Sequence, residues 1–215
     1  MTVGLEREVG HVGRRVLEIG AGFGNMTRQL LGRELVVASD LDPVALEYLR
    51  GAFRDEPEAR IASYRFPVSG EQRAEIRALG IDTVVCLNVL EHIEDDAGTL
   101  ADFFALLPSG GRVVLIVPAL ARLYGTLDEH LHHFRRYEKE ELSEKLRAAG
   151  FVVEDCRFLN RLGIIGWYLN GKILRRKVLP SGQLAAFRLA LPLLRREETN
   201  PPSTGMSLLA VGRKP

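Results

Sequence analysis

Short apolar runs alternate with helical patterns along most of the chain, which is the rhythm of a mostly parallel β-sheet. The apolar runs predict seven strands, at residues 15–20, 34–40, 60–66, 81–88, 112–117, 151–158 and 207–212. Helical patterns separate the first six strands, at residues 26–31, 43–53, 71–79, 95–106 and 139–149. We therefore expect an α/β fold with a doubly wound, mostly parallel seven-stranded sheet.

Two segments interrupt this rhythm. Residues 119–138 follow the fifth strand, and residues 160–206 form an insertion between the last two strands. A chain of 215 residues favours one domain with elaborations over two domains. We expect a single domain over residues 1–215. Ligands of doubly wound sheets bind outside the carboxyl ends of the strands, where the direction of winding changes.

Composition narrows the class of protein. The chain is 46% hydrophobic and 27% charged, as ordinary globular proteins are. Its 29 Lys and Arg residues nearly balance 28 Asp and Glu residues, so we expect no nucleic-acid partner. The balance is uneven, because residues 161–215 hold ten basic and two acidic residues. Cys86 and Cys156 lie in apolar runs and are expected to be free thiols, which excludes a disulfide scaffold and a zinc site.

A glycine-rich turn follows the first predicted strand and reads EIGAGFGN at residues 18–25. Glycine permits positive φ angles and lets a ligand approach the backbone closely. The helix expected after the turn offers free N–H groups to a carboxylate or phosphate. The dinucleotide pattern G-x-G-x-x-G would need glycine at position 25, which is Asn25. This difference disfavours an NAD(P)-dependent oxidoreductase, which we keep as the alternative enzyme.

An acidic residue marks the end of the second predicted strand. Asp40 lies twenty residues after Gly20, where a carboxylate accepts hydrogen bonds from a ribose diol in nucleoside-binding folds of this type. Asp42 is the rival for this role, but Pro43 follows it, which indicates that Asp42 caps the next helix. We therefore expect Asp40 to bind the ribose of a nucleoside.

The segments VLEIGAGFGN (16–25), ASDLDP (38–43) and CLNVLEHIEDD (86–96) together resemble the motifs of class I S-adenosylmethionine-dependent methyltransferases. The resemblance covers residues 14–160 and points to enzymes with small-molecule or lipid-linked acceptors, of the type 11/12-like group. It implies a Rossmann-like fold, S-adenosyl-L-methionine as cofactor and S-adenosyl-L-homocysteine as product. A methyltransferase-like scaffold that binds the cofactor without turnover is the other open alternative.

The resemblance assigns the cofactor site residue by residue. Gly20, Ala21 and Gly22 would pass under the methionine part, and Glu18 would bind its amino group directly or through water. Asp40 would take the ribose hydroxyls, and Leu41 would flank the adenine. Asn88 and Val89 would lie beside the methionine part and the reacting sulfonium.

The turn after the third strand departs from the family pattern. Many relatives have an acid there that contacts the adenine amine, whereas this chain has Tyr64, Arg65, Phe66 and Pro67. Arg65 or Phe66 would stack on the adenine base. The equal alternative is that Phe66 is simply a core residue.

Residues 119–138 resemble those of a methyltransferase subgroup associated with glycan or polyprenyl-lipid pathways, whose pattern is Tyr-Gly…Asp…Gly-His-x-Arg-Arg-Tyr. We predict a substrate loop with Tyr124, Asp128 and His133 as catalytic candidates and His133 as the general base. His132 stands where the subgroup has glycine, so the turn before His133 is open to difference.

Other charged and metal-binding candidates are less distinctive. Arg135 and Arg136 either bind an acidic group of the substrate or pair with acids at positions 138, 140 and 141. Glu91 and His92 are interpreted as structural residues that orient their loop, and we predict no metal site.

The insertion combines apolar stretches with arginines. Residues 160–206 form either a lid over the active site or a membrane-facing element, with peripheral membrane contact through 160–196. The apolar stretches are about half as long as a membrane span, and the first residues show no secretory signal. We expect a cytoplasmic enzyme, with the inner face of the membrane and a homodimer as open alternatives.

Overall fold

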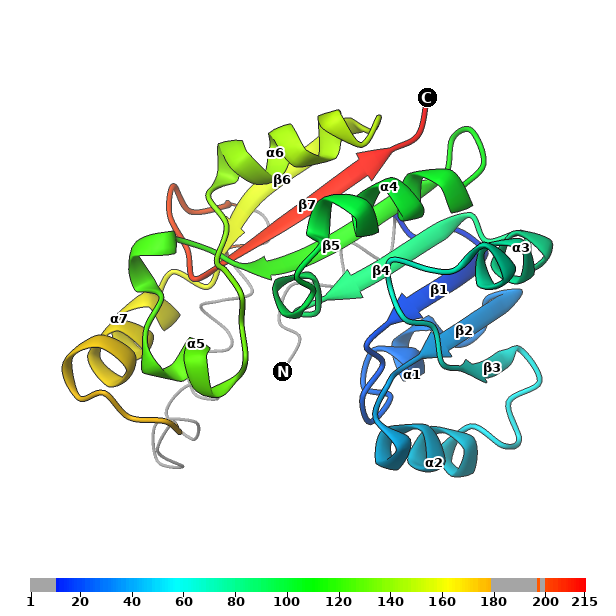
Figure 1. The fold of residues 1–215 in the computed structure, drawn as a ribbon, viewed down its shortest axis with the longest axis horizontal. Coiled ribbons are helices and arrows are strands. Elements are labelled where there is room, and N and C mark those ends of the chain that lie inside the picture. Colours follow the sequence, from blue (N-terminus) through cyan, green and yellow to red (C-terminus); the bar gives the residue numbers. More distant parts are fainter. Residues whose placement is uncertain (1–10, 179–196, 198–199) are drawn as a thin grey trace.

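The computed structural model describes residues 11–178, 197 and 200–215. Its seven strands form one sheet in the order β3-β2-β1-β4-β5-β7-β6 (Figure 1). The strands are β1 (Arg15–Ile19), β2 (Leu35–Ser39), β3 (Ala59–Ala62), β4 (Thr83–Leu87), β5 (Arg112–Pro118), β6 (Val152–Leu159) and β7 (Ser207–Arg213). All pairs are parallel except those of β7, which runs antiparallel to both β5 and β6. The expected doubly wound α/β fold is confirmed.

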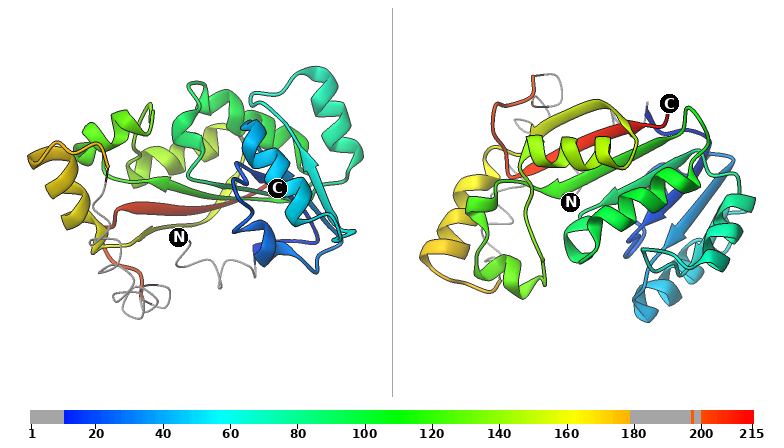
Figure 2. Two further views of the ribbon diagram at one scale, coloured as in Figure 1. Left: turned by 90° about the horizontal axis from the view of Figure 1, so that it is seen from below. Right: turned by 45° about the horizontal axis from the view of Figure 1, so that its top comes forward.

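Helices cover both faces of the sheet, as the edge-on view in Figure 2 shows. The helices are α1 (Thr27–Leu30), α2 (Pro43–Ala52), α3 (Gly70–Ala78), α4 (Asp96–Leu106), α5 (Thr126–His130), α6 (Lys139–Ala148) and α7 (Gly163–Tyr168). Short helical turns are η2 (Leu90–His92), η3 (Ala121–Leu123) and η4 (Leu169–Ile173). The apolar faces of α3, α4 and α6 share one core cluster, while α1 packs on the opposite face.

The central strands are almost wholly apolar because both of their faces are buried. In β5, Val113 and Leu115 belong to the cluster under α4 and α6, whereas Val114 and Ile116 belong to the cluster on the other face. This alternation is the period of two expected of a strand. In β1 it turns Glu18 to the side of Val16, toward α1.

Local signals in the sequence account for the helix ends. Asp42 caps α2 as expected, since its Oδ1 accepts the N–H of Val44 at 2.9 Å. Gly80 and Gly150 follow α3 and α6 with φ angles of +62° and +105°, the left-handed conformation that ends helices. The sequence did not predict α5, α7 or the helical turns. Much of the predicted insertion, including the apolar stretch at 184–194, lies outside the described residues.

The winding of the sheet reverses between β1 and β4. The chain runs outward from β1 to β3 and then returns to β4 on the other side of β1. The loops after β1 and β4 therefore face each other at the carboxyl edge of the sheet. Their approach is close, because a Cβ added to Gly20 would lie 2.2 Å from Cγ2 of Val89. This edge is where the fold places a ligand.

Candidate active site

A cavity of about 550 Å³ opens at this edge, and we call it the first cavity. Its walls come from the loops after β1, β2, β3 and β4 and from the loop before α6. The lining residues are Ile19, Gly20, Ser39, Asp40, Leu41, Tyr64, Arg65, Phe66, Val89, His92, Ile93, Glu94 and Phe134. Six of the ten residues predicted to contact the cofactor are among them.

The glycine turn contributes open space to the cavity, whereas most of its N–H groups are not available as hydrogen-bond donors to a ligand. Gly20 and Gly22 have φ angles of +72° and +53°, which favour glycine. The N–H groups of Gly20 and Ala21 already bond the carbonyl of Ser39, at 2.8 and 3.0 Å. The helix that follows, α1, has only four residues and presents little dipole. The turn therefore offers a ligand open space, and a Cβ on Gly22 would meet no protein atom within 4 Å.

Asp40 connects the turn to the second strand. Its Oδ2 accepts the N–H of Gly22 at 2.7 Å, and its Oδ1 accepts the N–H groups of Leu41 and Asp42 at 2.7 and 2.9 Å. A carboxylate has about four lone-pair sites, so one remains for a ligand hydroxyl. Asp40 can thus hold one ribose hydroxyl while it fixes the glycine turn.

Glu18 lies beneath the turn and does not line the first cavity. It is 3% exposed, and its Oε2 accepts the hydroxyl proton of Thr27 at 2.6 Å. Burial, with a contribution from the Asp40 charge, raises the pKa of Glu18 to about 7 although the Thr27 hydrogen bond opposes the shift. A direct contact with the amino group of a cofactor would therefore require the turn or the Glu18 side chain to move, whereas a contact through water would not.

The raised pKa of Glu18 makes stability depend on pH. The unfolded state loses the Glu18 proton near pH 4.5 and the folded state near pH 7, so the contribution of Glu18 to stability is greatest below pH 4.5 and falls as pH rises to 7. We expect Glu18→Gln, which carries no charge, to gain about 3 kcal/mol relative to the natural protein across this interval. Urea unfolding at several pH values measures it, with Glu47→Gln on α2 as control. An equal response of both variants would contradict the assignment.

The turn after β3 serves both the core and the cavity. Phe66 is buried against Phe103 of α4, with ring centroids 5.0 Å apart, and also lines the first cavity. Arg65 is exposed beside it. On the opposite rim, Leu41 and Phe134 are both about half exposed. Phe134 was not predicted, and its N–H bonds the carbonyl of Glu91 at 2.8 Å, which places it at the rim.

A second cavity of about 300 Å³ lies beside the first. Its lining residues are Asn88, Glu91, His92, Pro118, Leu131, His133, Arg136, Trp167, Met206 and Ser207. His92 lines both cavities, so the two are separated by one side chain. Val89 lines the first cavity and Asn88 the second, although both were predicted beside the cofactor. Asn88 turns the chain here with a φ of +54°, which asparagine tolerates.

Asp128 organises the wall of the second cavity. It is fully buried and accepts hydrogen bonds from Nδ1 of His133 at 2.9 Å and Nε of Arg136 at 2.7 Å. The indole of Trp167 and the N–H of Gly125 donate to its other oxygen, at 3.1 and 3.0 Å. Burial alone would raise the pKa of Asp128, but the donors and the charge of Arg136 lower it. Asp128 is therefore a carboxylate with all its acceptor sites filled.

This charge state fixes the tautomer of His133. A carboxylate only accepts hydrogen bonds, so Nδ1 of His133 donates to Asp128, and Nε2 is the ring nitrogen that this contact leaves unused. His133 is 9% exposed and lines the second cavity. Asp128 thus holds His133 in the form that can take a proton from a bound molecule. Tyr124 does not line either cavity, and its hydroxyl donates to the carbonyl of His133 at 2.8 Å.

The two arginines correct the sequence interpretation. Arg136 pairs with buried Asp128, and Arg135 pairs with Asp96 at 2.9 Å and donates to the carbonyl of Glu94. The sequence analysis had named other partners for both arginines. Each arginine pairs with an acid of a helix, which no local sequence pattern indicates. His132 has a φ of +59°, so it keeps the left-handed turn that the subgroup makes with glycine.

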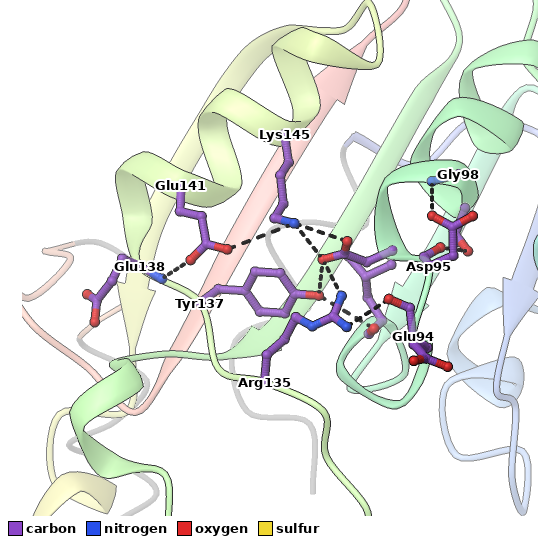
Figure 3. A network of polar contacts seen from close by, with 11 residues as sticks. Glu94, Asp95, Gly98, Arg135, Tyr137, Glu138, Glu141 and Lys145 are labelled. Carbon is purple, nitrogen blue, oxygen red and sulfur yellow. Dashed lines mark hydrogen bonds and ion pairs between the residues drawn. The ribbon is translucent and has the colours of Figure 1, made fainter.

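A polar network anchors the segment that carries His133 (Figure 3). Asp96, at the start of α4, accepts from the Tyr137 hydroxyl at 3.0 Å and from Lys145 of α6 at 3.0 Å. Burial would raise the pKa of Asp96, but hydrogen bonds from Lys145, Arg135 and Tyr137 lower it. The network fixes residues 133–137 between α4 and α6, and with them the wall between the cavities.

Glu91 and His92 are cavity residues rather than purely structural ones. Glu91 is 1% exposed, and its Oε2 has no hydrogen-bond partner. Burial raises the pKa of Glu91 to about 8, so the carboxyl is mostly protonated at neutral pH. Among the described residues, Glu91, His92 and His133 offer three ligand-type atoms within 4.8 Å of one another. Any test of His133 therefore needs a chelator control.

Trp167 is a residue of the second cavity that the sequence analysis did not predict. It is the only tryptophan of the chain and follows Gly166 in the glycine-containing segment of α7. Its ring lies over the guanidinium of Arg136, with Cζ 4.7 Å from the centroid. A single tryptophan beside glycines was the available signal, but its partner Asp128 is 39 residues away.

Comparisons with known proteins identify methyltransferases as relatives of this chain. A family model described as a methyltransferase domain matches residues 5–155. The mitochondrial ubiquinone biosynthesis O-methyltransferase of Schizosaccharomyces pombe is 30% identical over 67% of this chain and 57% of its own length. The ubiquinone biosynthesis O-methyltransferase of Pseudomonas aeruginosa strain LESB58 is 27% identical over 70% of each chain. The matched region thus spans little more than half of the first relative.

Solved structures share the fold. An S-adenosylmethionine-dependent methyltransferase of Mesorhizobium loti aligns with a TM-score of 0.65 at 17% identity, covering 98% of this chain and 95% of that one. Phosphoethanolamine N-methyltransferase 2 of Haemonchus contortus, solved with S-adenosyl-L-methionine, aligns with a TM-score of 0.59 at 17% identity, covering 95% and 49%.

The fold is a Rossmann-like α/β fold, and it places two adjoining cavities at the carboxyl edge of the sheet. The chain belongs to the S-adenosylmethionine-dependent methyltransferases. The residues present fit this cofactor, because the open space at Gly22 and the remaining acceptor site of Asp40 match its chain and its ribose. The NAD(P)-dependent alternative is not favoured.

Proposed function

We propose that this chain transfers a methyl group from S-adenosylmethionine in the first cavity to a hydroxyl oxygen of a small acceptor in the second cavity. The observation that carries this proposal is the shared wall, since His92 lines both cavities and His133 faces the second. The names of the sequence relatives, which are O-methyltransferases, support oxygen as the acceptor atom.

The residues in and around the second cavity have different roles in the proposed reaction. When bound, S-adenosylmethionine would supply a methyl group on a sulfonium, and a C–O bond to the acceptor would form as the C–S bond breaks, which releases S-adenosylhomocysteine and the hydroxyl proton. Nε2 of His133 accepts that proton from the hydroxyl, and Asp128 stabilises the imidazolium that results. Glu91, with a free buried oxygen, holds the acceptor by a hydrogen bond. Tyr124 positions the backbone of His133.

The segments around the site take the roles expected from the sequence. In this proposal residues 119–138 act as the substrate loop, and the described part of the insertion covers the second cavity, which Trp167 and Met206 support by lining its wall. A lipid-linked acceptor and a location at the inner face of the membrane are finer parts of the same proposal. We place the enzyme in the cytoplasm.

Two measurements on the purified chain test the proposal. We expect S-adenosylhomocysteine to bind at micromolar concentration while NAD(P) does not bind. We also expect radiolabelled methyl groups to pass from S-adenosylmethionine to hydroxylated molecules of a cell extract, in products that resist the conditions that cleave methyl esters. Cofactor binding without any turnover would identify a scaffold, and binding of NAD(P) alone would contradict the cofactor assignment.

A further inference from the structure

The outer side of α7 and the chain after it expose an unusual density of apolar side chains. Six of the thirteen exposed large hydrophobic residues in the described chain lie within residues 165–178, and the two most exposed of them are Ile165 at 70% and Val178 at 68%. The others are Tyr168, Leu169, Ile173 and Leu174. Figure 1 shows this region at the end of the molecule opposite β3. We call the outer side of residues 161–178 the basic apolar face.

Basic residues are interspersed with these apolar side chains along the sequence. Residues 161–178 contain five basic residues and no acidic ones, namely Arg161, Lys172, Arg175, Arg176 and Lys177. Arg122 of η3 adds a sixth, because it lines a surface groove of about 630 Å³ together with Lys172. The remaining walls of this groove are apolar or aromatic, formed by Leu123, Ile164, Ile165, Tyr168 and Leu169.

We propose that the basic apolar face docks on the surface of an anionic lipid bilayer. Apolar side chains at the tips of a short helix enter the boundary between headgroups and acyl chains, and lysines and arginines beside them attract anionic headgroups. Lys172 and Lys177 favour a lipid surface over a protein partner, because lysine is depleted from protein interfaces. Among the described residues, no helix is long and apolar enough to cross a membrane.

The face and the second cavity are two sides of one helix. Trp167 of α7 lines the second cavity from within, while Ile165 and Tyr168 of the same helix are exposed on the outside. Docking would therefore hold the acceptor cavity close to the lipid surface. The position of the acceptor cavity near the lipid rests on the proposed function, and it points to acceptors whose reactive group is carried at a membrane. The docking itself does not depend on methyl transfer.

Vesicle flotation of the full chain tests the docking. Vesicles of phosphatidylcholine with about 30% phosphatidylglycerol should recruit the protein, vesicles of phosphatidylcholine alone should not, and added salt should weaken recruitment. The double variant Lys172→Gln/Lys177→Gln should lower the partition coefficient by about 25-fold, since each basic residue contributes about fivefold. Arg54→Glu, an exposed reversal on the far side of the molecule, should leave it unchanged.

A second pair of variants probes the apolar contribution. Ile165→Ser/Ile173→Ser should lower partitioning about tenfold, and Val152→Ser on β6 should not. Equal or absent binding to both kinds of vesicle would overturn the proposal. So would a concentration-dependent dimer in sedimentation that the Ile165→Ser/Ile173→Ser variant abolishes, because a second copy of the chain would then occupy the face. Affinity for S-adenosylhomocysteine, measured in every variant, separates these outcomes from a failure of the proposed function.

Discussion

Replacing Gly22 by valine is expected to weaken the binding of S-adenosylhomocysteine by at least about 100-fold while the protein stays folded. The Cβ at this position points into space that contains no protein atom within 4 Å, so valine meets nothing within the fold. In the proposed binding mode the methionine part of the cofactor passes along this turn, so the valine side chain would take its place. The positive φ of +53° adds a backbone cost of about 1–2 kcal/mol, which a stable domain tolerates.

Gly110 provides a matched control for this variant. It has a φ of +80° and open space at its Cβ, but lies in the turn before β5, at the opposite edge of the sheet. Gly110→Val should lose similar stability in thermal unfolding and keep full affinity in calorimetric titration. Retained affinity in Gly22→Val would show that the cofactor does not pass along the glycine turn.

The His133→Asn variant should reduce kcat by about 100- to 10,000-fold with little change in cofactor affinity. The asparagine amide can still donate a hydrogen bond to Asp128 from the place of Nδ1, so the buried carboxylate keeps this partner. What disappears is Nε2, the atom that would accept the proton of the acceptor. His130→Asn in α5 changes an exposed histidine of the same loop and should keep normal turnover.

The control with a chelator distinguishes two explanations of such a loss. Glu91, His92 and His133 lie close enough to share an ion, so rates of the natural protein are compared with and without a chelator. An unchanged rate assigns the loss in His133→Asn to the missing base. Full activity of His133→Asn would show that the acceptor reacts without help from this residue.

The sequence predicted the sheet well because its central strands are buried on both faces. Such strands are continuous apolar runs, as β5 is after Arg112, and they can be predicted without knowledge of the neighbouring strands. The glycine turn and Asp40 were equally visible, because both lie at fixed places after the first two strands. Their positions at the first cavity follow from the topology alone.

The second cavity was much harder to predict, because its contacts join distant parts of the chain. Glu91 follows β4, His133 lies in the loop before α6, and Trp167 belongs to a six-residue helix with two glycines. The pairing of Arg136 with Asp128 also depended on burial, which leaves a carboxylate in need of a cation. No periodicity of the sequence reports such proximity.

The structure of the protein crystallised with S-adenosylhomocysteine tests the central claim most directly. The adenosyl group should lie in the first cavity with a ribose hydroxyl on Asp40, and the sulfur should point past His92 toward the second cavity. A ligand bound elsewhere, or a sulfur turned away from the cavity that holds His133, would contradict the account of two cavities joined for methyl transfer.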